Sequence, residues 1–229
     1  MTRLLLVGHG RMGQLVEQLA PTYGFELAGI ITEVDPDAFA RDYGRVDVAI
    51  DFTLPEAVPE NLPRLAARGI NVVIGTTGWL AHEAALKAEV ERAGTGVLAS
   101  ANFSVGMNLF VLLAEEAARR FGPHADFGAW LHELHHVAKK DAPSGTGVML
   151  QRAMVAAGYT RDIDVASTRA GSIPGTHTIG FDGPSETVTL THTVRDRGVF
   201  ARGALDAARW LVGRRGWFTM RDFLMNAGD

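Results

Sequence analysis

The first hundred residues alternate between short apolar runs and longer runs with helical spacing. Apolar runs that predict buried strands cover 3–7, 26–31, 46–52, 70–74 and 96–99. Helices are predicted over 14–20, from 55 onward and over 80–92, and Pro59 and Pro63 should bend or break the second one. Apolar strands that alternate with helices are typical of a parallel sheet covered on both faces. We therefore predict a doubly wound α/β domain here.

The pattern changes after residue 103. A long helix with an apolar stripe is predicted over 105–121, a strand over 127–135 and a second helix over 145–157. Strands rich in threonine and valine are predicted over 165–169, 176–181 and 185–194, followed by a helix over 200–213. This order of elements indicates a second, largely separate α+β domain.

Composition narrows the possible functions. Of the 229 residues, 47% are apolar, which is enough to bury a substantial core. A net charge of −4 without a basic run argues against nucleic-acid binding. The absence of cysteine excludes disulfides, thiolate zinc sites and a cysteine nucleophile. The apolar run before Gly8 is too short for a signal peptide or a membrane span, so we expect a cytoplasmic protein without a membrane partner.

A glycine-rich turn is the clearest candidate ligand site in the first half. Gly8-His9-Gly10-Arg11-Met12-Gly13 is a G-x-G-x-x-G motif between a predicted strand and a predicted helix. The first glycine permits a tight turn, the second lets a pyrophosphate approach the backbone, and the third lets helix and strand pack closely. The helix N-terminus offers N–H groups to the phosphates. An ordinary glycine-rich turn is the alternative, but the flanking elements favour a Rossmann-like dinucleotide site.

Three further segments extend this predicted site. Glu33 lies about 20 residues past the motif, where a ribose diol would bind, although it could equally be a surface carboxylate. The turns Gly75-Thr76-Thr77 and Ser100-Ala101-Asn102-Phe103 follow the fourth and fifth predicted strands. Because ligands of such sheets bind at the carboxyl ends of the strands, we expect all these turns to share one crevice.

The densest chemistry lies between residues 132 and 147. His132-Glu133-Leu134-His135-His136 matches the H-E-x-x-H motif of zinc proteases, which requires a helix. The preceding residues instead predict a strand, Pro143 prevents a following helix, and two lysines would repel a cation. We therefore expect no metal. Histidines on a strand can also be ordinary hydrogen-bonded residues, and that is the default for His132.

A third interpretation is acid/base catalysis on an anionic substrate. His135 and Lys139 could supply protons near neutral pH if burial and the neighbouring cation lower the pKa of the lysine. Ser144-Gly145-Thr146 would present N–H and hydroxyl donors at a helix N-terminus, where an oxyanion or carboxylate can bind. These groups would complement a hydride supplied by a nicotinamide in the first half.

The same stretch resembles a known family. Glu133-Leu134-His135-His136, followed by Lys139 and Asp141-Ala142-Pro143-Ser144-Gly145-Thr146, closely resembles the central motif of the 4-hydroxy-tetrahydrodipicolinate reductase (dihydrodipicolinate reductase) family. The resemblance covers the whole chain. The glycine turn, Asp51-Phe52-Thr53, Gly75-Thr76-Thr77-Gly78, Ala101-Asn102-Phe103-Ser104-Val105-Gly106 and Met220-Arg221-Asp222 occur in the family's order.

The resemblance implies a dinucleotide-binding domain of residues 1–103 plus 200–229, and a substrate-binding and oligomerisation domain of residues 104–199. It implies a homotetramer that reduces a small cyclic dicarboxylate in the diaminopimelate route to lysine, using NADH or NADPH. His135 and Lys139 match the family's proton donors, and His136, Gly145 and Thr146 match its substrate contacts, to which we add Ser144. The matching dinucleotide contacts are Gly8, His9, Gly10, Arg11, Met12, Gly13, Gly75, Thr76, Thr77, Ser100, Ala101, Asn102 and Phe103.

The sequence leaves alternatives for both the cofactor and the function. Some family members place Glu-Arg after the second strand, where this chain has Thr32-Glu33-Val34. A carboxylate without a nearby arginine favours NADH, because it would repel a 2′-phosphate, although Arg11 keeps NADPH open. The alternative functions are a zinc metallohydrolase and a non-catalytic dinucleotide-sensing regulator.

Overall fold

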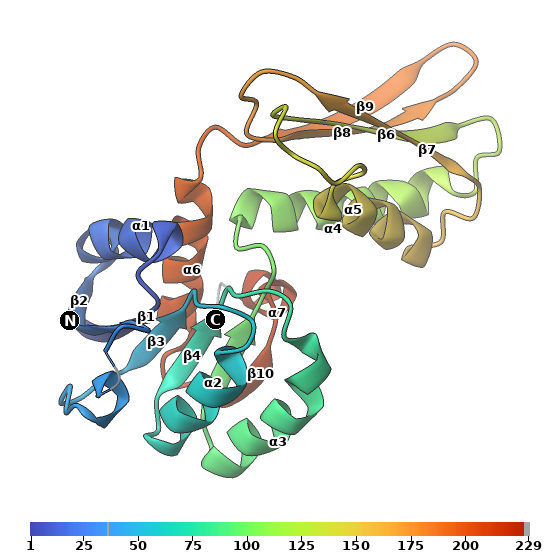
Figure 1. The fold of residues 1–229 in the computed structure, drawn as a ribbon. Helices are drawn as coiled ribbons and strands as arrows, with labels where there is room; N and C mark the ends of the chain where they lie inside the picture. Colours follow the sequence, from blue (N-terminus) through green and yellow to red (C-terminus); the bar gives the residue numbers. More distant parts are fainter. Residues whose placement is uncertain (36, 227–229) are drawn as a thin grey trace. The chain divides into compact units, whose positions relative to one another are not determined.

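The computed structural model describes residues 1–35 and 37–226, which form two compact units (Figure 1). The first unit contains residues 1–105 and the described part of 198–229, and the second contains Gly106–Arg197. The described strands form one sheet in each unit, with six strands in the first and four in the second. Within the described residues, no helix is both long and apolar enough to cross a membrane.

The first unit is the predicted doubly wound α/β domain. Its sheet has the order β10-β5-β4-β3-β1-β2, with all neighbours parallel. The strands are β1 (Thr2–Val7), β2 (Phe25–Ile31), β3 (Val48–Asp51), β4 (Asn71–Ile74), β5 (Gly96–Ala99) and β10 (Gly216–Phe218). Helices α1 (Arg11–Leu19), α6 (Gly198–Leu211) and α7 (Met220–Met225) pack on one face, and α2 (Val58–Ala67) and α3 (Glu83–Ala93) on the other. Short 3₁₀ helices cover Ala20–Tyr23, Ala38–Ala40 and Leu80–His82.

Strand β1 shows why these runs are continuously apolar. Leu4 and Leu6 belong to the core beneath α1 and α6, whereas Leu5 and Val7 belong to the core beneath α2 and α3. Successive side chains of a strand point to opposite faces, so a strand covered on both faces must be apolar throughout.

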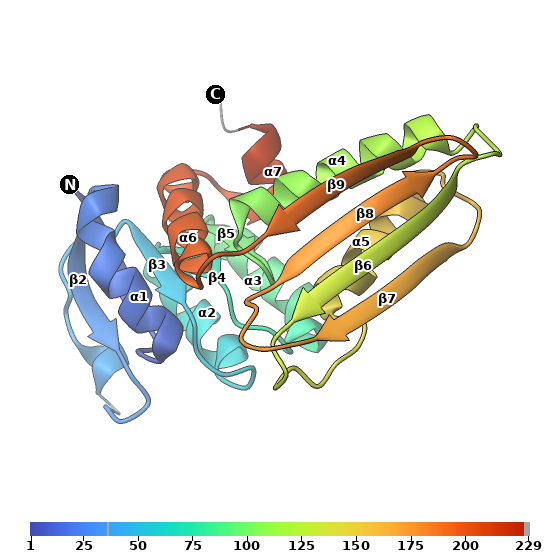
Figure 2. The same ribbon diagram turned by 90° about the horizontal axis from the view of Figure 1, so that it is seen from above.

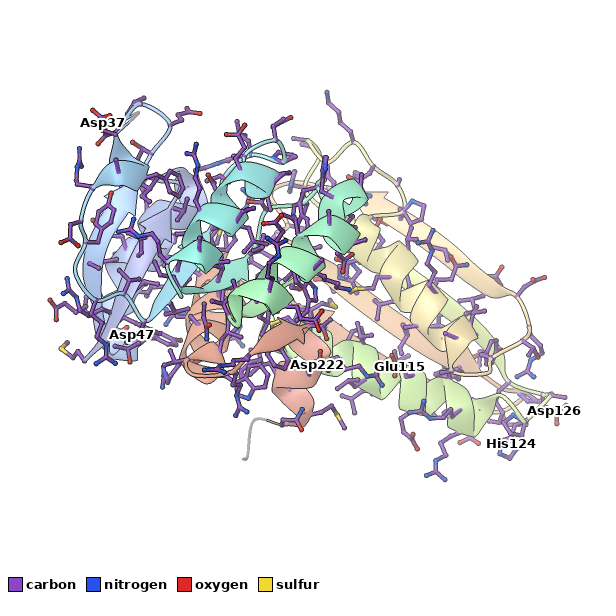
Figure 3. All side chains as sticks on the ribbon, turned by 90° about the horizontal axis from the view of Figure 1, so that it is seen from below. Asp37, Asp47, Glu115, His124, Asp126 and Asp222 are labelled. Carbon is purple, nitrogen blue, oxygen red and sulfur yellow. The ribbon has the colours of Figure 1, made fainter. Side chains whose placement is uncertain are left out.

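Three features of this unit differ from the sequence prediction or add to it. Strand β10 extends the sheet beyond β5, with Gly216 opposite Gly96, and its three residues are too few to show a periodic pattern. Pro63 does not break α2: it removes one backbone donor, and Pro59 lies in the first turn, where N–H groups have no partner within the helix. Helix α7 begins with a capping box between Thr219 and Asp222. Asp222 is labelled in Figure 3.

The second unit is a mixed sheet covered on one face. The order is β7-β6-β8-β9, where β6 (Gly128–His135) is parallel to β7 (Ile163–Arg169) and antiparallel to β8 (Thr176–Asp182), which pairs with β9 (Thr187–Thr193). Helices α4 (Val105–Phe121) and α5 (Gly145–Ala156) pack on one face of this sheet (Figure 2). Their apolar residues form a core with Leu131, Ile179 and Phe181. Trp130, His132 and Leu134 alternate with the core positions of β6 and therefore face the opposite side.

Candidate active site

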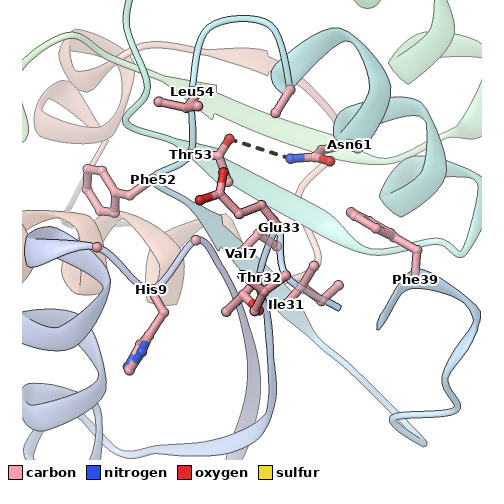
Figure 4. A pocket seen from close by; sticks show the side chains of 14 residues that line it. Val7, His9, Ile31, Thr32, Glu33, Phe39, Phe52, Thr53, Leu54 and Asn61 are labelled. Carbon is pink, nitrogen blue, oxygen red and sulfur yellow. Dashed lines mark hydrogen bonds between the residues drawn. The ribbon is translucent and has the colours of Figure 1, made fainter. Parts of the chain in front are cut away.

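A pocket of about 510 Å³ adjoins the glycine turn within the first unit (Figure 4). Of the predicted cofactor residues, Gly8, His9, Gly10 and Glu33 line it. The other lining residues are Val7, Ile31, Thr32, Val34, Phe39, Phe52, Thr53, Leu54, Ala57 and Asn61. The volume lies in the range of small-molecule sites, roughly 300–1,000 Å³.

Glycine suits each of the three positions in the turn for a different physical reason. Gly8 has a φ of +90°, and a Cβ there would lie 2.5 Å from the carbonyl oxygen of Phe52. A Cβ on Gly13 would collide with the carbonyl oxygen of Gly8. At Gly10 a Cβ would meet nothing within 4 Å, so this glycine leaves the backbone open to the pocket that it lines. The turn thus offers bare backbone beside the N-terminus of α1, as a pyrophosphate requires.

His9 contributes backbone to this pocket rather than its ring. Its Nε2 lies 2.7 Å from Oε2 of Glu17 on α1. The ring points away from the other lining side chains (Figure 4). Arg11 and Met12 are the first residues of α1 and do not line the pocket.

The turns after β4 and β5 are held by a buried carboxylate and by a local network. Asp51, which is 2% exposed, accepts hydrogen bonds from the Thr53 N–H at 2.9 Å, from Asn61 at 3.1 Å and from Thr76 at 3.2 Å. Burial raises the pKa of Asp51, and these bonds oppose the rise. In the second turn, the hydroxyl of Ser100 accepts from the Asn102 N–H. Residues 75–77 and 100–103 do not line the pocket.

In the second unit, strand β6 separates the residues of the H-E-x-x-H motif. Glu133 and His135 lie on its buried face, whereas His132 faces the other side and its Nε2 lies 2.9 Å from the Thr168 hydroxyl. A zinc-protease motif needs a helix that brings both histidines to one face. The strand removes that geometry.

Glu133 is the centre of the buried cluster. Its side chain is fully buried, and Oε1 accepts from Arg169 at 2.7 Å and from the Ser144 N–H at 3.2 Å. Oε2 contacts Nδ1 of His135 and forms an ion pair with it when the imidazole is protonated. Burial alone would raise the pKa of Glu133, but hydrogen bonds from Ser167, Arg169 and Ser144 and the charge of His135 lower it to about 2. The carboxylate is therefore ionised at neutral pH.

Two histidine rings pack edge to face beside this carboxylate. The rings of His135 and His177 lie 5.1 Å apart at 73°. Burial lowers the pKa of His135; Glu133 raises it, and Lys139 and Arg169 lower it further. Burial, with the charge of His135, lowers the pKa of His177 to about 4, so His177 is neutral near pH 7.

Glu133, His135 and His177 each offer one ligand atom within 4.8 Å of the others, a set that could hold a metal ion. Two features oppose that use. Oε1 of Glu133 already accepts from a guanidinium and a backbone N–H, and Oε2 contacts Nδ1 directly, which leaves no space for an ion between them. Lys139 and Arg169 also add two positive charges to the cluster.

The residues after β6 bring a lysine to the start of α5. The ammonium of Lys139 lies 2.9 Å from Oδ1 of Asp141, and the Lys139 N–H donates to the carbonyl of His136. The hydrogen bond from Lys139 is the largest cause that holds the pKa of Asp141 below its usual value, and the Gly145 N–H makes a smaller contribution. Ser144 caps α5 and its hydroxyl accepts from the Gly147 N–H at 3.1 Å. A carboxylate thus already rests on the predicted anion site, formed by Lys139 and the N-terminus of α5.

Arg169 and His177 were not among the residues predicted from sequence. Strand pairing places Arg169 opposite His135 on β7 and His177 opposite Glu133 on β8. Each lies more than thirty residues from its partner in the chain, so no local pattern could join them. For Asp51, the presence of polar partners could be predicted, because a carboxylate that ends an apolar strand needs them.

A parallel sheet with a glycine turn, joined to a unit with buried acid/base groups, defines the class of a dinucleotide-binding oxidoreductase. Comparison with known proteins specifies it further. Residues 2–103 match the family model for dihydrodipicolinate reductase, N-terminus, and residues 106–224 match the model for its C-terminus. The chain belongs to the dihydrodipicolinate reductase family.

Similar proteins of nearly the same length carry the names of this family. The 4-hydroxy-tetrahydrodipicolinate reductase of Christiangramia forsetii is 32% identical over 96% of this chain and 97% of its own. That of Caldanaerobacter subterraneus subsp. tengcongensis is 35% identical over 98% of both chains. In fold, the chain resembles a dipicolinate-bound dihydrodipicolinate reductase from Paenisporosarcina sp. TG-14, with a TM-score of 0.82 at 20% identity over 96% of this chain and 97% of that one.

Proposed function

We propose that this chain reduces 4-hydroxy-tetrahydrodipicolinate to tetrahydrodipicolinate in the diaminopimelate route of lysine biosynthesis. Family membership and the names of the relatives support this activity. The structural observation that carries it is the Asp141 carboxylate on the Lys139 ammonium, next to the N–H groups at the start of α5. These donors would exchange that internal carboxylate for one of the two carboxylates of the substrate.

The first unit is proposed to bind NADH or NADPH. The open backbone at Gly10, the close approach at Gly8 and Gly13 and the adjoining pocket fit a pyrophosphate and ribose. The turns at 75–77 and 100–103 are proposed to contact the rest of the dinucleotide. When bound, the reduced nicotinamide supplies a hydride. NADH is the proposed preference, because the Glu33 carboxylate lines the pocket and would repel a 2′-phosphate.

The second unit is proposed to bind the substrate and supply protons. His136, Ser144, Gly145 and Thr146 would hold the dicarboxylate, and His135 and Lys139 would give protons to the atoms that gain negative charge on reduction. We also propose a cytoplasmic homotetramer assembled through this unit. In the part of the chain that the structure describes, α4 and α5 cover one face of its sheet and leave the other for a subunit contact. Light scattering after gel filtration tests the tetramer.

The deciding experiment follows the nicotinamide absorbance with freshly made product of the preceding synthase and either NADH or NADPH. Substrate-dependent loss of absorbance supports the reductase. Tight dinucleotide binding without that loss would support a sensing regulator instead, and chelator-sensitive hydrolysis would support a metalloenzyme.

A further inference from the structure

Glu133 and His135 form a buried pair whose contact decides which ring nitrogen of the histidine carries a proton. Glu133 and His135 are two residues apart on β6, so both side chains lie on the same buried face. An ionised carboxylate that contacts Nδ1 requires a proton on that nitrogen. In the neutral ring, Nε2 then carries only a lone pair, and in the charged ring Nε2–H is the proton available for transfer.

Nε2 of His135 has room on its other side. A Cβ on Gly175 would lie only 3.1 Å from this atom, and Gly175 has a φ of +152°, which favours glycine. The absence of a side chain at residue 175 therefore leaves Nε2 uncovered there. The imidazole thus contacts the carboxylate at Nδ1 and is open near Nε2.

The neighbouring groups keep the carboxylate available for His135. Ser144 Oγ accepts from the Gly147 N–H and lies 3.2 Å from Nε2 of His177. His177 is neutral near pH 7 and so presents no charge to Glu133. Arg169 and the Ser144 N–H hold Oε1, which leaves Oε2 directed at His135.

We propose that Glu133 is the positioning residue of His135: its carboxylate fixes the ring tautomer and stabilises the imidazolium that donates its Nε2 proton. In that step the Nε2–H bond breaks, the proton passes to the substrate atom made negative by hydride addition, and the neutral ring keeps Nδ1–H on Glu133. The Ser144 contact also ties this carboxylate to the start of α5, where the substrate carboxylate is proposed to bind. The inference rests on the proposed role of His135 as a proton donor.

The test compares Glu133→Gln, which keeps the size and removes the charge, with Glu133→Asp and with Glu186→Gln on the exposed turn between β8 and β9. Glu133→Gln should lower kcat by about 10-fold to 10²-fold, a part of the roughly 10²–10⁴-fold that general acid catalysis supplies. The limb of the pH–rate profile that reports loss of the His135 proton should move to lower pH, with KM nearly unchanged. Glu133→Asp should recover part of kcat, and Glu186→Gln should match the wild type.

A second measurement needs no turnover. Nitrogen NMR of the folded wild type should show the Nδ1–H tautomer of His135, and Glu133→Gln should lower its titration midpoint. An unchanged tautomer and midpoint, or a fall in kcat with an unmoved pH profile, would overturn the positioning role. If the wild type consumes no reduced dinucleotide, the proposed function fails, and NMR still decides whether Glu133 holds His135. Loss of wild-type activity with a chelator, restored by zinc, would assign the cluster to a metal instead.

Discussion

The two units build their candidate sites from different materials. In the first unit, the pocket beside the glycine turn is lined largely by backbone and apolar side chains, with glycines where a Cβ would collide or cover the backbone. In the second unit, the site is made of buried and half-buried titratable groups, with Glu133, Arg169, His135 and Lys139 in one network. A dinucleotide needs shape and fixed N–H dipoles, whereas proton transfer needs groups whose charge can change.

This contrast predicts two kinds of sensitivity. Substitutions in the glycine turn of the first unit should act through steric fit, and their effects should depend little on pH. Substitutions in the second should act through charge, and removal of one partner leaves another charge buried and unpaired.

The largest effect is expected at Lys139. Lys139→Ala removes both a proposed proton donor and the cation that holds a carboxylate at the start of α5. Turnover should fall by about 10²–10⁴-fold, while NADH affinity measured by fluorescence stays the same, because the glycine turn is untouched. The adjacent, exposed Lys140 provides the matched control as Lys140→Ala. Near-normal turnover in Lys139→Ala would remove this lysine from the mechanism.

A smaller effect should appear when the second unit is acidified. The pKa of His177 is lowered to about 4 from 6.5, so below pH 6.5 the unfolded chain takes up a proton that the folded chain refuses. Because of this residue, the free energy of unfolding should fall by about 3 kcal/mol between pH 7 and pH 4. Urea unfolding across that range should show a shallower loss for His177→Gln than for the wild type.

The first unit provides the contrast to that titration. Burial raises the pKa of Asp51, so its uptake of a proton on acidification favours the folded state. Equal pH slopes for His177→Gln and the wild type would show that the buried histidine is not a source of acid sensitivity.

The glycine turn offers a purely steric test of the comparison. Gly13→Ala should cost about 1–3 kcal/mol of stability, because its Cβ would collide with the Gly8 carbonyl. Gly10→Ala should leave stability nearly unchanged, since its Cβ meets nothing, yet weaken dinucleotide binding by covering the open backbone. Thermal melts with and without NADH separate the two outcomes. Equal stability losses in both variants would contradict the separate roles assigned to these glycines.

The sequence predicted local features well and long-range pairings poorly. Apolar runs such as Leu4–Val7 and the glycine turn carry their structural reasons within a few residues. The positions of Arg169 and His177 instead depend on the register of β7 and β8 against β6, which tertiary packing decides. The predicted roles of His135 and Lys139 remain proposals, but the partners that would tune them became visible only through that register.

The smallest effect is expected at Glu33, which lines the pocket but is exposed, so solvent screens its charge. Glu33→Gln should improve kcat/KM for NADPH relative to NADH by only a few-fold, corresponding to roughly 0.2–1 kcal/mol. Asp37→Asn, an exposed carboxylate on the following loop (Figure 3), should leave the ratio unchanged. Because the repulsion acts through solvent, the wild-type preference should weaken as salt is added, whereas a preference set by shape would persist. If the preference does not depend on salt, the choice of cofactor is set by steric fit at the glycine turn and not by the charge of Glu33.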